Sequence, residues 1–354
     1  MTDSIRIEST DLQTPEVEEY VETQNYLQRS IGAVDDQPWI IRLVYANWFY
    51  LAICSMAGAL AGWAILEPWY DDNSEAEIDV VGILLFPVVA AFVGLFLGAA
   101  EGIICRNPFR ALKCGVVGMG VGFVGGFVAL IPTSIVFGIS STLAVSLWDN
   151  PAENTMPTGI ALLVLMMGRS VAWAIAAIPG GMGQGIALKE RKVIINGVVG
   201  ALLGGLVGGL LFDPISLILL TEDGQATYSR AVGFAAIGGS VGLFVGLVEG
   251  WTKTAWLLMR KGPLAGKQFI LFKDTTVLGS SPKADVYLFK DDAIEPRHAQ
   301  IINRGGRFEI EDCDTPDGTY VNGVMVRRHV LQNGDQIVLG KTLLEFSVTE
   351  AKQT

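Results

Sequence analysis

Polar side chains recur inside apolar sequence, and they are the first candidates for chemistry. Glu101 and Glu249 occupy the same position in two near-copies of one decapeptide, VGLFLGAAEG and VGLFVGLVEG, and Gln184 holds that position in a shorter copy, GMGQG. Arg169 and Arg230 begin two other related segments, RSVAWA and RAVGFA. Ionisable groups within a membrane are costly and commonly mark ion or substrate pathways. These five residues are therefore the membrane candidates.

Two interpretations of these residues remain open. The two glutamates stand at the ends of their apolar runs, close in sequence to Arg106 and Lys253, and the two arginines are long enough to reach the opposite interface. Interfacial anchoring explains this placement. The recurrence of glutamate in one repeated context favours the alternative, an ion-coupling role.

No constellation for catalysis is recognisable. The two histidines, His298 and His329, are near the C-terminus, and the four cysteines are scattered, as expected of reduced thiols. Gly120-Val-Gly-Phe-Val-Gly fits the dinucleotide pattern, but that motif works after a strand and at a helix start, and here it lies in an apolar run. We therefore expect a non-enzyme with no catalytic residue, no cofactor and no metal.

Composition indicates a membrane protein. Of 354 residues, 51% are hydrophobic and 17% are charged, whereas soluble domains are about 25% charged. The formal net charge of −11 provides no basic footprint for nucleic acid.

Six runs are apolar enough to form spans of about 20 residues. They are 46–66, 82–104, 114–136, 160–188, 193–212 and 231–250. We expect an acidic cytoplasmic tail (1–44), a glycine-rich transmembrane domain (45–262) and a soluble domain (263–354). The polar segment 132–148 is either re-entrant or an extension beyond the membrane. The run 214–220 is too short to span, and whether it is re-entrant stays open.

Loop charges predict the orientation. The loops at 106–113, 189–192 and 253–261 hold nine Lys or Arg, while 67–80, 149–157 and 213–229 hold eleven acids and no base. Basic loops face the cytoplasm. We therefore expect an integral protein of the plasma (inner) membrane with both termini in the cytoplasm.

Glycines spaced four apart occur in every expected span, as in Gly94/Gly98/Gly102 and Gly238/Gly242/Gly246/Gly250. Glycine at this spacing lets two helix backbones approach closely. A glycine zipper between helices or subunits is one interpretation, and a glycine-lined pore is the other. The repeated segments also suggest a duplicated helical hairpin.

The C-terminal part contains short β-rich runs, including KQFILF, DVYLF and QIVLG, separated by Asp-Gly and Asn-Gly turn signals. This pattern predicts a small all-β sandwich. The motifs TTVLGSSPKADVYL, IEPRHAQI, DGTYVNG and NGDQIVLG follow the order and spacing of a forkhead-associated (FHA) domain, which this part resembles.

The resemblance implies an eleven-stranded sandwich whose loops at one end bind phosphothreonine peptides. His298 matches the histidine that ties those loops together. Gly279, Gly318, Asn322 and Gly323 match the family's turn positions.

The positions that handle phosphate in the family differ here. Ser280 replaces an arginine, Glu295 a serine and Asp317 an asparagine, and with Arg297 these residues are the peptide-facing candidates. Phosphothreonine carries about −1.5 to −2 charges and needs charge-assisted donors. A lost cation and two added carboxylates oppose that anion, so we expect no conventional phosphothreonine binding.

The leading hypothesis is a membrane-anchored adaptor or signalling protein that presents an FHA-like module. The alternative is a channel or transporter that this module regulates. The loop face then binds an unphosphorylated, basic segment of a cytoplasmic protein, docks on the chain's own membrane domain, or is only a folded module. The lipid bilayer is a further partner, and a homo-oligomer is a candidate assembly.

Overall fold

The computed structural model describes residues 38–70, 80–148, 157–219 and 227–349. Its contacts divide the chain into a helical unit, 46–252, and a β unit that begins at Lys253 and to which 38–45 are also assigned. Most of the expected acidic tail, 1–37, lies outside the described residues, and its last part forms the short helix α2 (Trp39–Val44).

The helical unit consists of six long α-helices and one short 3-10 turn in the described part of the chain. They are α3 (Asn47–Leu66), η2 (Glu67–Trp69), α4 (Val80–Ile104), α5 (Pro108–Ser146), α6 (Gly159–Leu188), α7 (Arg191–Leu219) and α8 (Thr227–Thr252). All six α-helices are long and apolar enough to cross a membrane. They correspond to the six expected spans.

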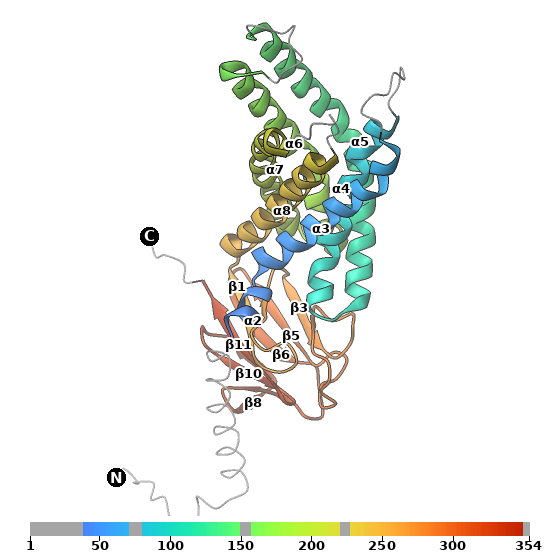
Figure 1. Ribbon diagram of the computed structural model, residues 1–354. Coiled ribbons are helices and arrows are strands. Elements are labelled where there is room, and N and C mark those ends of the chain that lie inside the picture. The colour runs from blue at the N-terminus through green and yellow to red at the C-terminus, as the bar shows by residue number, and fades with distance from the viewer. Residues whose placement is uncertain (1–37, 71–79, 149–156, 220–226, 350–354) are drawn as a thin grey trace, which may run out of the picture. The chain divides into compact units, whose positions relative to one another are not determined.

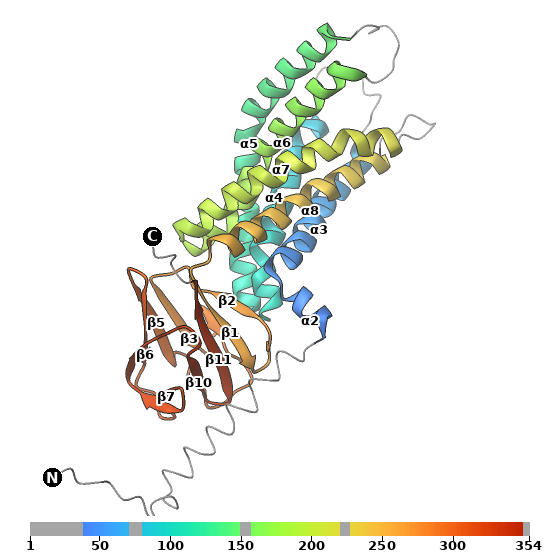
Figure 2. The same ribbon diagram turned by 90° about the vertical axis from the view of Figure 1, so that its left-hand side faces the viewer.

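These helices pack as a closed ring, because each contacts the next in the chain and α3 also contacts α8. At the centre, Trp173 stacks on Phe86 at 4.9 Å between ring centroids and meets Phe234 edge-on at 5.6 Å. Helices α5 and α6 lie side by side and reach beyond the ends of the other helices (Figures 1 and 2). The ring thus has an aromatic core in which distant segments meet.

The breaks considered at 132–148 and 214–220 are absent from the described residues. Helix α5 continues through Pro132 to Ser146, and α7 continues through Pro214 to Leu219. Hydroxyl groups in the second half of α5 donate to carbonyls of their own helix, as from Ser140 to Phe137 and from Thr142 to Gly138. The polar residues are therefore accommodated without unwinding, and α5 extends to about 58 Å at ~1.5 Å per residue.

Glycines occupy the helix contacts. A Cβ atom on Gly94 of α4 would strike the carbonyl of Gly118 of α5, and a Cβ atom on Gly118 would strike the carbonyl of Gly94. Gly181 of α6 and Gly197 of α7 face each other in the same way, and Gly242 of α8 faces a backbone carbonyl of α3. Each copy of the repeated segment thus lies in a helix pair, and the third pair joins α8 to α3. This arrangement favours the packing interpretation of the glycines.

The β unit is a sandwich of two sheets. The strands are β1 (Ala255–Lys261), β2 (Gln268–Ile270), β3 (Thr275–Gly279), β4 (Val286–Tyr287), β5 (Ala299–Arg304), β6 (Arg307–Asp312), β7 (Thr319–Val321), β8 (Val324–Val326), β9 (Arg328–Val330), β10 (Gln336–Leu339) and β11 (Thr342–Val348). One sheet has the order β2-β1-β11-β10-β7-β8 and the other β4-β3-β5-β6-β9. The structure therefore has the two-sheet, eleven-strand sandwich that the FHA resemblance implies.

The sandwich begins earlier than the expected boundary at residue 263. Strand β1 pairs antiparallel with both β11 and β2, and its Ala255, Leu257 and Met259 are at most 1% exposed. The run AWLLMR lies between the last expected span, 231–250, and the expected domain boundary, in a stretch interpreted from its charges as a basic loop. The alternating burial of its apolar residues shows instead that they are core positions of a strand.

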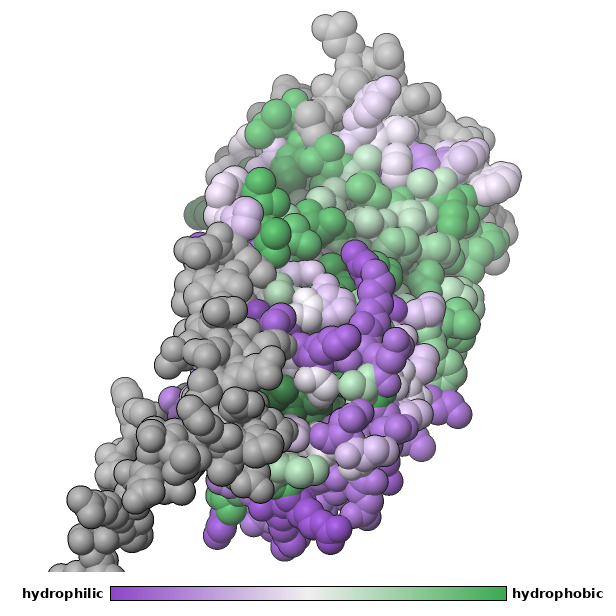
Figure 3. All heavy atoms as spheres, turned by 90° about the horizontal axis from the view of Figure 1, so that it is seen from below, coloured by the Kyte–Doolittle hydropathy of each residue, from purple (hydrophilic) through white to green (hydrophobic). Residues whose placement is uncertain are grey.

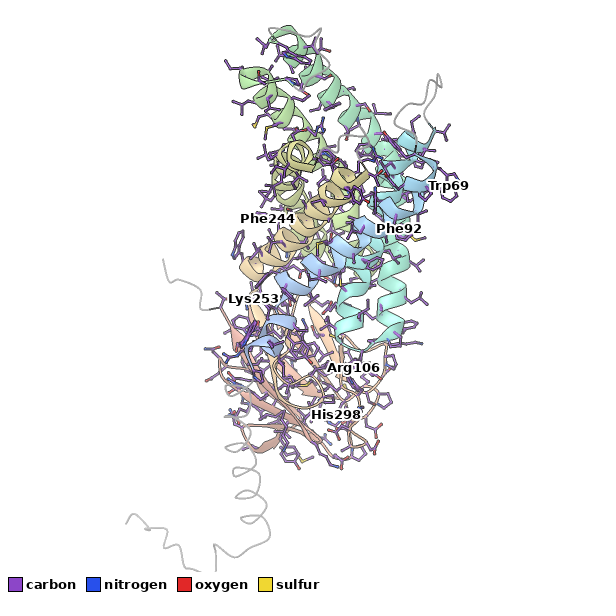
Figure 4. The ribbon with its side chains drawn as sticks, viewed as in Figure 1. Trp69, Phe92, Arg106, Phe244, Lys253 and His298 are labelled. Carbon is purple, nitrogen blue, oxygen red and sulfur yellow. The ribbon has the colours of Figure 1, made fainter. Side chains whose placement is uncertain are left out.

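The surfaces of the two units differ. Figure 3 shows separate hydrophobic and hydrophilic areas on one face. Nearly all the exposed large hydrophobic side chains belong to residues 39–251, and those of the sandwich are Val324 and Met325, within the described residues. Trp69, which is 69% exposed, points outward from the helical unit (Figure 4). An apolar exterior of this kind is expected of helices that face lipid.

Two glycines of α5 provide a matched test of the backbone contacts. Gly118→Val should destabilise the helical unit by about 1–3 kcal/mol, because the added side chain meets the α4 backbone. Gly120→Val should be nearly neutral, since a Cβ atom there meets nothing within 4 Å. Thermal unfolding of the two purified variants in detergent measures the difference. Equal melting temperatures would contradict the packing role.

Candidate functional site

The loop face of the sandwich, which we define as residues 279–283, 292–298 and 313–318, is held together by backbone hydrogen bonds. The Ser280 amide donates to the carbonyl of Glu295 at 2.9 Å, and the Ser281 amide donates to that of Pro296 at 3.4 Å. A Cβ atom at position 279 would strike the Pro296 carbonyl and lie 3.0 Å from that of Glu295. Glycine is needed at position 279 because two backbone segments of the chain approach each other closely there.

His298 lies buried within this face, with 0% of its surface exposed (Figure 4). Its Nδ1 accepts from the Glu295 amide at 3.2 Å, so the ring proton is assigned to Nε2, which donates to the Gly318 carbonyl at 3.1 Å. The backbone of His298 also bonds to Leu278 and Cys313. One side chain thus connects the loop before β5 with the loop before β7.

Asp312 at the end of β6 organises the third loop. Its carboxylate accepts from the Thr315 hydroxyl at 2.8 Å, the Thr319 hydroxyl at 2.7 Å and the Thr315 amide at 2.9 Å. Burial acts to raise the pKa of Asp312, but the hydrogen bonds from Thr319 and Thr315 outweigh it and hold that pKa below its usual value. The carboxylate therefore stays charged in the folded domain well into the acid range.

The four peptide-facing candidates lie in these loops with different environments. Glu295, Arg297 and Asp317 are exposed, whereas Ser280 is partly buried. Asp317 directly precedes Gly318, whose φ of +66° and carbonyl bond to His298 shape the turn. These positions remain predicted contacts for a ligand.

Arg297 forms a side-chain hydrogen bond at the edge of the loop face. Its guanidinium donates to Gln300 Oε1 at 2.6 Å, and Gln300 Nε2 donates to Glu311 Oε2 at 2.8 Å. Burial raises the pKa of the neighbouring Cys313 thiol, although the charge and hydrogen bond of Arg297 act in the opposite direction. A second base, the exposed Lys283, lies three residues after Ser280 in the same loop and is not among the residues predicted from the sequence.

The sequence analysis did not recognise the Asp312 network either. Its signal is the spacing Asp312–Thr315, because an aspartate commonly caps the backbone of a turn two or three residues later.

Among the described residues, no group of three or more His, Cys, Asp or Glu side chains is arranged to hold a metal ion. What the loop face offers chemically is a hydrogen-bonded backbone with four exposed carboxylates, at Asp292, Glu295, Asp314 and Asp317.

Asn322 and Gly323 form a different turn, between β7 and β8. Both have positive φ, +52° and +83°, as a tight hairpin requires. The Asn322 side chain donates to Asp335 Oδ1 at 2.8 Å and accepts from the Gln336 amide at 2.9 Å. These two residues stabilise the fold and lie outside the loop face.

The polar candidates of the helical unit form contacts across helices. Glu101 pairs with Arg110 at 2.7 Å, not with the nearby Arg106, and also accepts from Gln184 Nε2 at 3.3 Å. The side chain of Glu249 accepts from Asn47 Nδ2 at 3.4 Å. Two of the three polar residues of the repeated segment are thus in direct contact.

The arginines do not lie free at an interface. Arg169 is ion-paired with the buried Asp213 at 2.9 Å and lies over the ring of Phe137. Arg230 is ion-paired with Glu67 at 2.6 Å and lies over Tyr70. Both arginines therefore pair with carboxylates from distant parts of the chain, and their placement at an interface stays a prediction.

The Asp312 network provides a test of how the loop face is stabilised. Because the pKa of Asp312 is lower in the folded state, its stabilising contribution is present above the unfolded value of about 3.9 and is lost as the pH falls through the folded value. Asp312→Asn should therefore lower the free energy of unfolding at neutral pH by about 1–3 kcal/mol, with a smaller deficit at about pH 2.5. Urea unfolding of fragment 253–354 at both pH values measures this. An equal deficit at both would contradict the role of the charge.

Comparison with known proteins agrees with this geometry. The family model described as FHA domain matches residues 276–340. The oxoglutarate dehydrogenase inhibitor of Corynebacterium jeikeium is 40% identical over 101 residues, which are 28% of this chain and 67% of that protein. The glycogen accumulation regulator GarA of Mycolicibacterium smegmatis is 38% identical over 123 residues, 34% of this chain and 77% of that protein.

A solved FHA domain from a Chlamydia trachomatis protein is 28% identical, with a TM-score of 0.26, and the match covers 27% of this chain and 99% of that one. The motifs, the two-sheet sandwich, the buried His298 and the family match agree with one another. The chain therefore belongs to the family of FHA-domain proteins.

Proposed function

We propose that this protein is a membrane-anchored adaptor that presents its FHA domain to protein partners at the cytoplasmic face. FHA domains are protein-interaction modules, and the six apolar helices are long enough to cross a bilayer. The proposal assigns no catalytic activity to the chain. The relatives named above are, by name, an inhibitor and a regulator, which supports a regulatory interaction rather than a reaction.

The observation that carries the proposal is the short connection between the two units. Helix α8 ends at Thr252 and β1 begins at Ala255, so two residues link the last candidate span to the FHA domain. The three steps from Thr252 to Ala255 span about 11 Å at most. A domain tethered this closely to a bilayer is restricted to partners that come to the membrane.

The orientation follows from the loop charges. The connections at 106–113 and 189–192 are basic, and Lys253 follows the last helix, whereas the loops at the other ends of the helices hold acids and no base. By the positive-inside rule, both termini and the FHA domain lie on the cytoplasmic side. The helices lie in the plasma (inner) membrane.

The partner is an unphosphorylated protein segment with basic residues. Where relatives offer an arginine and a serine, this loop face has Ser280 and Glu295. Asp317 is also exposed, as are two further carboxylates of the same loops, Asp292 and Asp314. Like charges about 4 Å apart repel by roughly 4 kcal/mol at an effective dielectric constant of 20, and solvent screening reduces this value. These carboxylates therefore disfavour a phosphate and favour lysine or arginine, although Lys283 and Arg297 moderate the negative potential.

A channel or transporter regulated by the FHA domain is the second candidate. The contact between Glu101 and Gln184 and the buried Glu249 favour it, because polar groups at repeated positions meet inside the helical unit. The ion pairs and backbone contacts already described account for most of these groups, so the adaptor stays the leading proposal.

Titration with phosphothreonine peptides tests the loop face. Fragment 253–354, which includes β1, should bind them no more tightly than the same peptides without phosphate. Ser280→Arg combined with Glu295→Ser should increase phosphopeptide affinity at least about tenfold, because a guanidinium replaces a hydroxyl and a carboxylate is removed. Fluorescence anisotropy measures both, and Glu295→Gln alone separates the effect of the charge from that of the serine. Micromolar binding by the unmodified fragment that dephosphorylation abolishes would contradict the proposal.

Flux measurements separate the adaptor from the channel. Liposomes containing the full chain should show no ion flux above empty liposomes, and Glu101→Gln with Glu249→Gln should change nothing. A salt gradient with a potential-sensitive dye detects the flux. Flux that the two substitutions abolish would reject the adaptor and support the second candidate.

A further inference from the structure

A cavity of about 330 Å³ lies within the helical unit. Side chains of α4, α5, α6, α7 and α8 and the residue that follows η2 line it. Six of them are aromatic: Tyr70, Phe86, Phe137, Trp173, Phe212 and Phe234. A volume of this size with mostly apolar and aromatic walls is typical of a small-molecule site.

Two guanidinium groups, Arg169 and Arg230, also line the cavity. Each is already balanced by a carboxylate, Asp213 at 2.9 Å and Glu67 at 2.6 Å. Each also lies over an aromatic ring, at 5.2 Å from the Phe137 centroid and 4.5 Å from that of Tyr70. The charge of an ionic ligand would therefore have no counter-charge in this low-dielectric site, and burying an unpaired charge costs free energy.

One hydrogen-bond donor of the cavity wall lacks a partner among the described residues. Thr133, on α5, is 7% exposed, and its buried hydroxyl has no hydrogen-bond partner. The Nε–H group of Arg169 has none either, but both carboxylate oxygens of its ion partner Asp213 are also without hydrogen bonds, so this donor and these acceptors lie in one ion pair. Buried polar groups are almost always paired, so an unpaired buried donor beside a cavity indicates a missing acceptor.

We propose that this cavity binds a neutral amphipathic molecule with an aromatic or aliphatic body and a carbonyl group. The rings of Trp173 and Phe234 contact the body, and the carbonyl oxygen accepts from the Thr133 hydroxyl. The same chemistry is available from a soluble ketone or ester and from the ester linkage of a membrane lipid. The site is independent of the proposed adaptor function.

Three probes with one aromatic body test the proposal. Full-length protein in detergent is titrated with 4-phenylbutan-2-one, 3-phenylpropanoate and 3-phenylpropylamine, and binding is followed by saturation-transfer NMR with protein-free micelles subtracted. We expect the neutral ketone to bind saturably and more tightly than the acid or the amine. Absence of saturable ketone binding, or tighter binding of either charged probe, would overturn the proposal.

Substitutions on α5 locate the binding. Thr133→Val should weaken ketone binding about three- to tenfold, because one hydrogen bond is lost while the shape is kept. Thr133→Ser should restore it. The matched control is Thr142→Val on the same helix, where the exposed hydroxyl bonds to Gly138, and it should leave affinity unchanged. Equal affinities for the 133 and 142 valine variants, each shown to be folded by its melting temperature, would overturn the assignment.

A comparison of detergent with lipid nanodiscs distinguishes the two sources of the carbonyl. If a lipid ester fills the cavity, ketone affinity falls in nanodiscs; if the natural ligand is soluble, affinity is the same in both. Either result supports the site, provided that the Thr133→Val difference is present in detergent.

Discussion

The hydrogen bonds of one buried imidazole hold the FHA domain's loop face in place. His298 accepts a hydrogen bond from one loop and donates one to another, so it needs a single tautomer and a site closed to water. Because these bonds involve backbone groups, the loop side chains are free to differ. Ser280, Glu295 and Asp317 can therefore replace the family's phosphate-binding residues while the frame stays intact.

Backbone atoms also form the main contacts of the helical unit, here by close packing rather than by hydrogen bonds. Gly94 against Gly118 and Gly181 against Gly197 bring helix backbones together where any side chain would collide. The pairs Arg169–Asp213 and Arg230–Glu67 then join helices from distant parts of the chain. A rigid bundle of this kind suits an anchor, and it also encloses a cavity whose charges are balanced.

Much of this arrangement could be predicted from the residues. Apolar runs predict the six helices, and the order of four motifs predicts the sandwich and the place of His298. The start of β1 could not be predicted, since AWLLMR lies between two lysines in a segment that is interpreted from its charges as a loop after the last span. The partners of Arg169 and Arg230 were also hidden, because residue spacing does not reveal pairs that form between helices. Hydroxyl bonds to its own backbone explain why α5 does not break at its polar half.

The central claim is that the FHA domain's loop face binds a cationic protein segment rather than a phosphate. Backbone amide NMR of fragment 253–354 during titration with an unphosphorylated lysine-rich peptide tests it most directly. The account predicts saturable shifts confined to Ser280, Glu295, Asp317 and their neighbours, and their loss in high salt. Shifts centred on another surface, or none, would contradict it.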